Sequence, residues 1–214
     1  MNQPEILSQN IGDAEVQYLY YPGDGPTVIL LHATGFLPWL WHPLARSLAG
    51  EYRVLAPYFC DHRHAEPEEG LEWMLLADDL CRFCEGLGVE RPLLAGHSMG
   101  ATVMTLAEAL HGPVARGMVL FEPIFLPGEI YQMDLTIDQH PLASKSIKRR
   151  NHWEDASEAR DYLRSRALYR NWDDEMMDLY ILYGMVPGET GGLNLLCPPR
   201  RAAAIVMGSQ QRDP

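Results

Sequence analysis

Short runs of apolar residues alternate with segments of helical periodicity along the first 123 residues. One run, TVILLHA at 27–33, shows almost no polar face, which is typical of a strand buried on both sides in a parallel sheet. We expect strands at 14–21, 27–33, 52–58, 91–97 and 114–123, and helical segments at about 43–50, 71–87 and 98–110. This order predicts an α/β fold with a mainly parallel sheet and flanking helices.

The pattern changes after Pro123. From 124 to about 190 the sequence shows helical patterns and no convincing strand. Asp155 and Ser157 are both candidates to cap one helix, and Asp173 is placed to cap another. The helix after Asp173 carries a broad apolar stripe of Met176, Met177, Leu179, Tyr180, Leu182 and Tyr183. Such a stripe is expected to form core, or to wall a pocket if the helices fold over the sheet. We predict an α/β core at 1–125, a helical cap at 126–190, and the start of a return to the core at 191–214.

Composition limits the classes of partner. The 214 residues, 47% of them hydrophobic, suffice for one large core. A formal net charge of −12 argues against nucleic acid and against an anionic membrane surface, because both need a basic face. We find neither a secretory signal nor the roughly 18 consecutive apolar residues of a membrane span, and expect a soluble, cytoplasmic protein.

No metal and no cofactor are expected. Cys81 and Cys84 form a close cysteine pair, but they lie inside a helical pattern with no second pair of ligands near them. We interpret both as ordinary buried helix positions. The nearby His62 and His64 are expected in a solvated loop.

The stretch LLAGHSMGATVM at 93–104 carries the strongest chemical signal. In it, Gly96-His97-Ser98-Met99-Gly100 follows an apolar strand directly and leads into a helical pattern. A G-x-S-x-G sequence in this strand-turn-helix context is how a serine nucleophile is presented. The glycines leave room where a Cβ would clash with backbone, and the turn holds the serine in a strained conformation. We therefore predict Ser98 as a nucleophile at the carboxyl end of its strand.

A second motif, LLHATGF at 30–36, ends an earlier strand with small residues before a loop. Such a loop can direct a backbone N–H toward the oxyanion that forms when Ser98 attacks a carbonyl, and the N–H of Met99 completes this hole. The alternative is a plain strand-to-loop transition. The functional interpretation is favoured because one βα unit separates the strands of the two motifs.

These stretches resemble the α/β-hydrolase family. LLHATGF is similar to its oxyanion loop, with Ala33 where glycine is usual, and AGHSMGA is similar to its nucleophile elbow. The resemblance implies Thr34 as the first oxyanion donor and Glu122 as an acid that orients a histidine. Other members of the family place an aspartate after the seventh strand instead, and Glu122 is then a structural carboxylate at the pocket mouth. It also implies a small-molecule acyl substrate such as an ester, thioester or amide, or C–C bond hydrolysis. Relatives with an aspartate nucleophile are disfavoured because residue 98 is serine.

The histidine base is the missing part. In this fold it follows the last strand, but only His111, His140 and His152 come after Ser98. His111 lies at the far end of the helix that Ser98 begins, about 20 Å away, and His140 and His152 fall in the expected cap. His97 should point to the face opposite Ser98.

No further apolar strand follows the cap, so we expect a hydrolase fold that is incomplete at its C-terminus. The uncovered sheet edge should favour self-association, and ester hydrolysis should be weak without the base. Two functions stay open. One is a serine hydrolase that forms an acyl-enzyme at Ser98, with a base from elsewhere or an unorthodox one such as His140; the other is a non-catalytic, hydrolase-like binding or scaffold protein.

Overall fold

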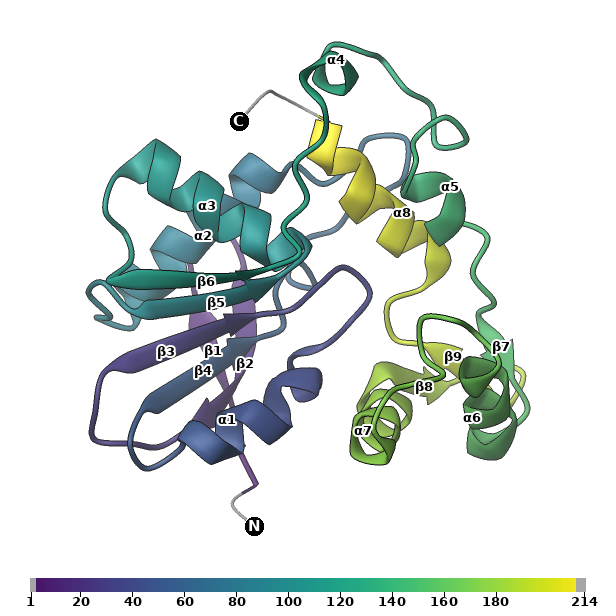
Figure 1. Ribbon diagram of the computed structural model, residues 1–214, viewed down its shortest axis with the longest axis horizontal. Helices are drawn as coiled ribbons and strands as arrows, with labels where there is room; N and C mark the ends of the chain where they lie inside the picture. Colours follow the sequence, from purple (N-terminus) through teal and green to yellow (C-terminus); the bar gives the residue numbers. More distant parts are fainter. Residues whose placement is uncertain (1–2, 211–214) are drawn as a thin grey trace.

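A computed structural model describes residues 3–210 of the chain, and its core is a sheet in the strand order β1-β2-β4-β3-β5-β6 (Figure 1). The strands are β1 (Glu5–Asn10), β2 (Glu15–Tyr21), β3 (Thr27–Leu31), β4 (Arg53–Pro57), β5 (Leu93–His97) and β6 (Gly117–Phe121). Strands β4, β3, β5 and β6 are parallel, whereas β1 and β2 are antiparallel. The predicted α/β fold is confirmed. Strand β1 was not predicted because its side chains are nearly all exposed and show no apolar alternation.

Helices cover both faces of the sheet, as the apolar strands predicted. One face packs against α2 (Trp73–Gly86) and α3 (Met99–His111), and the other against the short η1 (Pro38–Trp41) and α1 (His42–Leu48). Alternate residues of β3 divide between these layers: Ile29 and Leu31 join the first cluster, Val28 and Leu30 the second. This two-sided burial fixes the carboxyl ends of the parallel strands, where the chemistry was predicted.

The segment after β6 is not purely helical. It contains α4 (Gly128–Tyr131), α5 (Ala143–Ser146), α6 (Ala156–Arg164) and α7 (Asp174–Gly184), and also the strands β7 (His152–Trp153), β8 (Met185–Pro187) and β9 (Leu193–Leu195). The strands pair as a small antiparallel sheet in the order β7-β9-β8. The expectation of no convincing strand from 124 to about 190 is thus corrected by β7 and β8, and that of no further strand after the cap by β9. Runs of two or three residues are too short to show alternation. The predicted caps Asp155 and Asp173 each accept a backbone N–H in the first turn of their helix.

The chain returns to the α/β core in α8 (Pro199–Met207), followed by η2 (Gly208–Gln210). The Trp73 indole N–H donates to the carbonyl of Ile205 at 2.7 Å, and the N–H of Leu71 donates to the carbonyl of Ala204 at 3.0 Å. Helix α8 also packs on α5, so it joins the core to this part of the cap (Figure 1). The boundaries at 125 and 190 stay predictions, and residues 211–214 of the predicted return lie outside the described residues.

Within residues 3–210, no helix combines the length and the apolar character that crossing a membrane requires.

Strand β6 forms a free edge of the sheet. It pairs with β5 on one side and with no other strand of the described residues on its other side (Figure 1). Met118, Val119, Leu120 and Phe121 are 36–55% exposed. A row of unpaired backbone groups beside exposed apolar side chains is a template for pairing with another chain.

We expect this edge to associate with a second copy of the chain, and Val119→Lys to reduce that association. A lysine on an edge strand opposes pairing by charge repulsion and desolvation. Size-exclusion chromatography with light scattering should show a smaller associated fraction. The free energy of unfolding should change by no more than about 0.5 kcal/mol. Leu168→Lys, at an exposed site in the cap, is the matched control. Equal association of both variants and the unchanged chain would contradict the edge as the contact.

Candidate active site

Ser98 occupies the turn between β5 and α3. Its backbone has φ 55° and ψ −118°, and a positive φ costs energy in a residue other than glycine. The N–H of Ser98 donates to the carbonyl of Phe121 at 2.9 Å, and its carbonyl accepts the N–H of Thr102 at 3.1 Å. These bonds fix the turn between the end of β6 and the first turn of α3.

Two glycines make this turn sterically possible. A Cβ at Gly96 would lie 2.6 Å from the backbone nitrogen of Ala101. A Cβ at Gly100 would lie 2.6 Å from the carbonyl oxygen of Leu31 and 2.8 Å from that of His32. The second contact shows that the start of α3 packs directly on the loop that follows β3. The two predicted motifs therefore lie side by side on adjacent parallel strands.

His32 fixes the loop after β3. Its ring is 2% exposed; Nδ1 lies 2.9 Å from the carbonyl oxygen of Ala33, and Nε2 accepts the N–H of Phe59 at 3.0 Å. The ring is therefore neutral, with its proton on Nδ1, and burial lowers its pKa further below the ordinary value. The N–H of Phe36 donates to the Ala33 carbonyl at 3.0 Å and closes a turn around Thr34. Ala33 in place of glycine is compatible with this path.

The first residue of α3 is Met99, whose N–H has no acceptor within its own helix because it precedes the first helical hydrogen bond. Thr34 lies in the neighbouring loop and is partly exposed. The predicted oxyanion donors thus belong to the loop after β3 and to the first turn of α3, which pack against each other at Gly100.

Glu122 follows β6 directly and is exposed, with φ 46°. Burial lowers the pKa of His97, and the Glu122 carboxylate opposes that shift. Thr102 of α3 holds the next part of this segment: its hydroxyl accepts the N–H of Ile124 at 2.9 Å and lies 3.0 Å from that residue's carbonyl oxygen. Sequence reasoning missed Thr102, because a threonine inside a helix gives no signal of such a bond.

An apolar cavity of about 370 Å³ opens at the carboxyl ends of β3, β5 and β6, under α7. It is lined by His32, Ala33, Phe36, Leu40, Trp41, His97, Phe121, Trp172 and Met176. The predicted site residues Thr34, Ser98, Met99 and Glu122 are not among its lining residues. Ala33, His97 and Phe121 instead each directly precede one of these residues in the chain.

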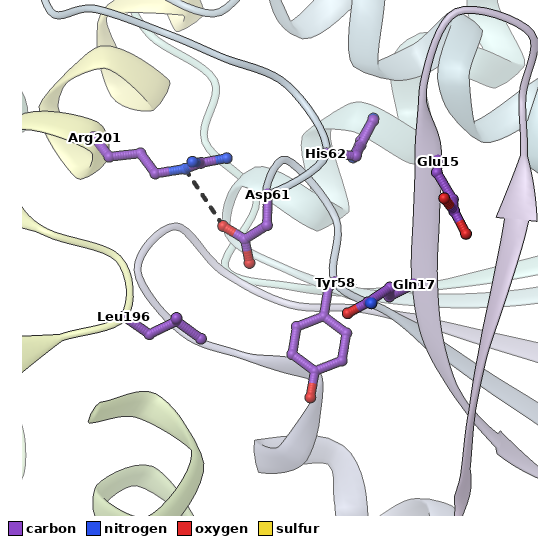
Figure 2. A pocket seen from close by; sticks show the side chains of 7 residues that line it. All are labelled: Glu15, Gln17, Tyr58, Asp61, His62, Leu196 and Arg201. Carbon is purple, nitrogen blue, oxygen red and sulfur yellow. Dashed lines mark ion pairs between the residues drawn. The ribbon is translucent and has the colours of Figure 1, made fainter. Parts of the chain in front are cut away.

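A second cavity, of about 490 Å³, is polar and lies beside the ends of β2 and β4 (Figure 2). Its lining residues are Glu15, Gln17, Tyr58, Asp61, His62, Leu196 and Arg201. Figure 2 shows the Arg201 guanidinium directed at Asp61, with which it forms an ion pair at 3.5 Å. None of the predicted site residues lines this cavity.

The cysteine pair lies on a helix as expected, but the environment of His62 differs from the expectation. Both cysteines lie on α2, where burial raises the thiol pKa to about 11 for Cys81 and about 12 for Cys84. His64 is exposed, but His62 is not in a solvated loop: its side chain is buried and bonds Asp79 at 2.8 Å. Within residues 3–210, no group of three or more His, Cys, Asp and Glu side chains is arranged to hold a metal ion.

All eight histidines lie within the described residues, and none of them hydrogen bonds to Ser98. His140 is fully buried: Nδ1 accepts the N–H groups of Leu142 and Ala143, and Nε2 lies 3.2 Å from the Ser209 hydroxyl. His111 pairs with Asp78, and His152 with Asn194. The structure therefore gives His140 an internal role in the cap, and no histidine of the chain completes a triad with Ser98.

A protein-family model decides the family. The model described as "Alpha/beta hydrolase family" matches residues 28–212, most of the chain. The chain belongs to the alpha/beta hydrolase family.

Similar proteins differ in how much of the chain they match. The magnesium-chelatase 30 kDa subunit of Rhodobacter capsulatus is 34% identical to this chain over 99 residues, which cover 44% of the chain. The match spans 34% of that subunit, so the chain corresponds to about a third of that relative's length.

Solved structures share the fold over nearly the whole chain. E-2-(acetamidomethylene)succinate hydrolase superposes with a TM-score of 0.77 at 22% identity, covering 97% of this chain and 74% of that one. The thioesterase domain from the curacin biosynthetic pathway gives 0.73 at 19% identity, with 97% and 77% covered. An alpha/beta hydrolase from Novosphingobium aromaticivorans gives 0.73 at 23% identity, with 94% and 70% covered. At these identities the likeness establishes the fold alone.

Proposed function

We propose that this family member is a serine hydrolase that forms an acyl-enzyme at Ser98. The observation that carries the proposal is the backbone of Ser98, held at φ 55° between a strand and a helix by Gly96 and Gly100. Strain of this kind persists only where the surrounding structure enforces it, and it clusters at functional sites. A turn of this kind presents the serine hydroxyl at the carboxyl end of β5, beside the first turn of α3.

Attack of the Ser98 hydroxyl on a carbonyl would create an oxyanion next to the N–H groups of Thr34 and Met99. Preformed backbone donors stabilise such charge without reorganisation, and removing one typically costs about 10²–10³-fold in rate. The fixed His32 ring supports this role for the loop, because it holds the Ala33 carbonyl from one side. Glu122 is proposed as the acid of the site, on its place at the end of β6.

The substrate class we propose is a small acyl compound with an apolar acyl group. The cavity of about 370 Å³ beside Ser98 is lined mainly by apolar and aromatic side chains, among them Phe36 and Phe121. The fold relatives include a hydrolase named for an acetamidomethylene succinate and a thioesterase domain. An ester or thioester is consistent with both the cavity and those names.

Ser98 should react covalently with a fluorophosphonate probe, and Ser98→Ala should abolish the labelling, because the probe reports a nucleophilic serine beside an oxyanion hole. Intact-mass spectrometry under folded conditions measures the adduct, and peptide mapping assigns it. Ser47→Ala, an exposed serine on α1, is the matched control and should label like the unchanged chain.

Steady turnover of 4-nitrophenyl esters should be slow, since no histidine bonds Ser98 and an oxyanion hole without a complete triad gives only about 10³–10⁴-fold catalysis over water. The same absence favours a second function, a non-catalytic binding protein with a hydrolase shell. Absence of any Ser98 adduct in the folded chain would establish that alternative against the hydrolase.

A further inference from the structure

Arg149, in the segment between α5 and β7, reaches from the cap to the loop after β3. Its Nη2 donates to the hydroxyl of Tyr180 at 2.8 Å and lies 3.3 Å from the hydroxyl of Tyr169. Its Nη1 would lie 2.7 Å from a Cβ at Gly35, the residue next to Thr34. Gly35 has φ 72°, which favours glycine, and the guanidinium lies close against it.

The charge of Arg149 is not neutralised by its neighbours. Within residues 3–210 it forms no ion pair, although the neighbouring Arg150 pairs with Glu158. The Tyr180 hydroxyl is neutral, because burial raises the pKa of Tyr180 far above physiological pH. A partly buried cation without a counter-charge is costly, so Arg149 favours negative charge at the surface that it approaches. The backbone it approaches is the predicted oxyanion loop.

We propose that Arg149 is a positioning residue of the oxyanion hole, which supports the Thr34 loop and favours negative charge there. The proposal rests on the proposed function of Ser98, because the counter-charge is the oxyanion that forms when the Ser98 hydroxyl attacks the acyl carbonyl and that is lost when the leaving group departs. A positive charge fixed in the protein before reaction stabilises such an anion in the transition state more than the neutral substrate. The expected effect is on the rate of covalent reaction and not on substrate affinity.

The test measures the concentration dependence of Ser98 labelling by a fluorophosphonate, which gives both an affinity and a maximal rate. Arg149→Met should lower the maximal rate about tenfold, less than loss of a direct oxyanion donor, and leave the half-saturating concentration unchanged. Arg149→Lys, which keeps the charge, should recover most of the rate. Tyr180→Phe removes a bond to Arg149 but not the charge and should change the rate by less than about threefold. Arg150→Met is the matched control.

Thermal unfolding of each variant separates folding from chemistry. If Tyr180→Phe slows labelling as much as Arg149→Met, or if Arg149→Lys is as slow as Arg149→Met, the charge is not the cause and the proposal is overturned. Normal labelling of Arg149→Met also overturns it, while leaving Ser98 as the nucleophile. Absence of labelling in the unchanged chain removes the proposed function and this role with it.

Discussion

Gly100→Ala is expected to abolish fluorophosphonate labelling of Ser98 and to lower the free energy of unfolding by about 1–3 kcal/mol or more. The new Cβ would lie 2.6 Å from the Leu31 carbonyl oxygen and 2.8 Å from that of His32. The first is a backbone atom of β3 and the second a backbone atom of the loop after β3, so neither can rotate away. Relief requires α3 to move off the loop that carries Thr34, which separates the two halves of the oxyanion hole.

Labelling rates and chemical denaturation of the same preparations measure both effects. Gly117→Ala in β6 is the matched control, because its Cβ meets only the Leu93 side chain at an ordinary 3.5 Å. It should retain labelling and change stability little. A Gly100→Ala variant that labels at the normal rate would show that the contact between α3 and the loop is not needed for the chemistry.

The sequence predicted the elbow and the parallel strands well because their constraints are local. A buried strand must be apolar on both faces, as Val28 to Leu31 are, and a serine at positive φ needs small residues two positions away on each side. Strand β1 carries no such mark, since it is exposed on both faces and is held by backbone pairing with β2.

Interactions between distant segments could not be read from the sequence. The small cap sheet joins His152 to Asn194, and the buried pair of His62 with Asp79 joins a loop to α2. Arg149 reaches Gly35 across more than a hundred residues. No periodicity encodes these contacts, because each depends on how separate elements pack.

The lining of the apolar cavity could not be predicted from the sequence. His97 and Phe121 line it, and they are the last residues of β5 and β6, directly before Ser98 and Glu122. Ser98 and Glu122 leave their strands in turns, where strand periodicity no longer indicates which way a side chain points. Phe36 stacks near His97, with ring centroids 6.2 Å apart, and continues that wall into the loop.

Acidification from pH 7.5 to 5.5 is expected to destabilise the protein, because its buried histidines are held in the neutral form. His32, His42 and His140 are less than 8% exposed, and burial lowers the pKa of each. His32 and His140 each use a ring nitrogen to accept backbone N–H groups, so a second proton would break those bonds. In the unfolded chain the same rings titrate near their ordinary pKa of about 6.5.

The unfolded state therefore binds more protons than the folded state below pH 6.5. The stabilisation is fully present above that pH and is lost as the pH falls toward the lowered pKa of each folded ring, by at most about 1.4 kcal/mol per pH unit for each such histidine. The carboxylate of Asp79, with its pKa lowered mainly by Arg63, stays ionised throughout this range. Urea denaturation at pH 7.5, 6.5 and 5.5 measures the slope. His140→Asn should reduce it, and His64→Gln, at an exposed site, should not. Stability that is flat or rises on acidification would show that these rings accept protons in the folded state.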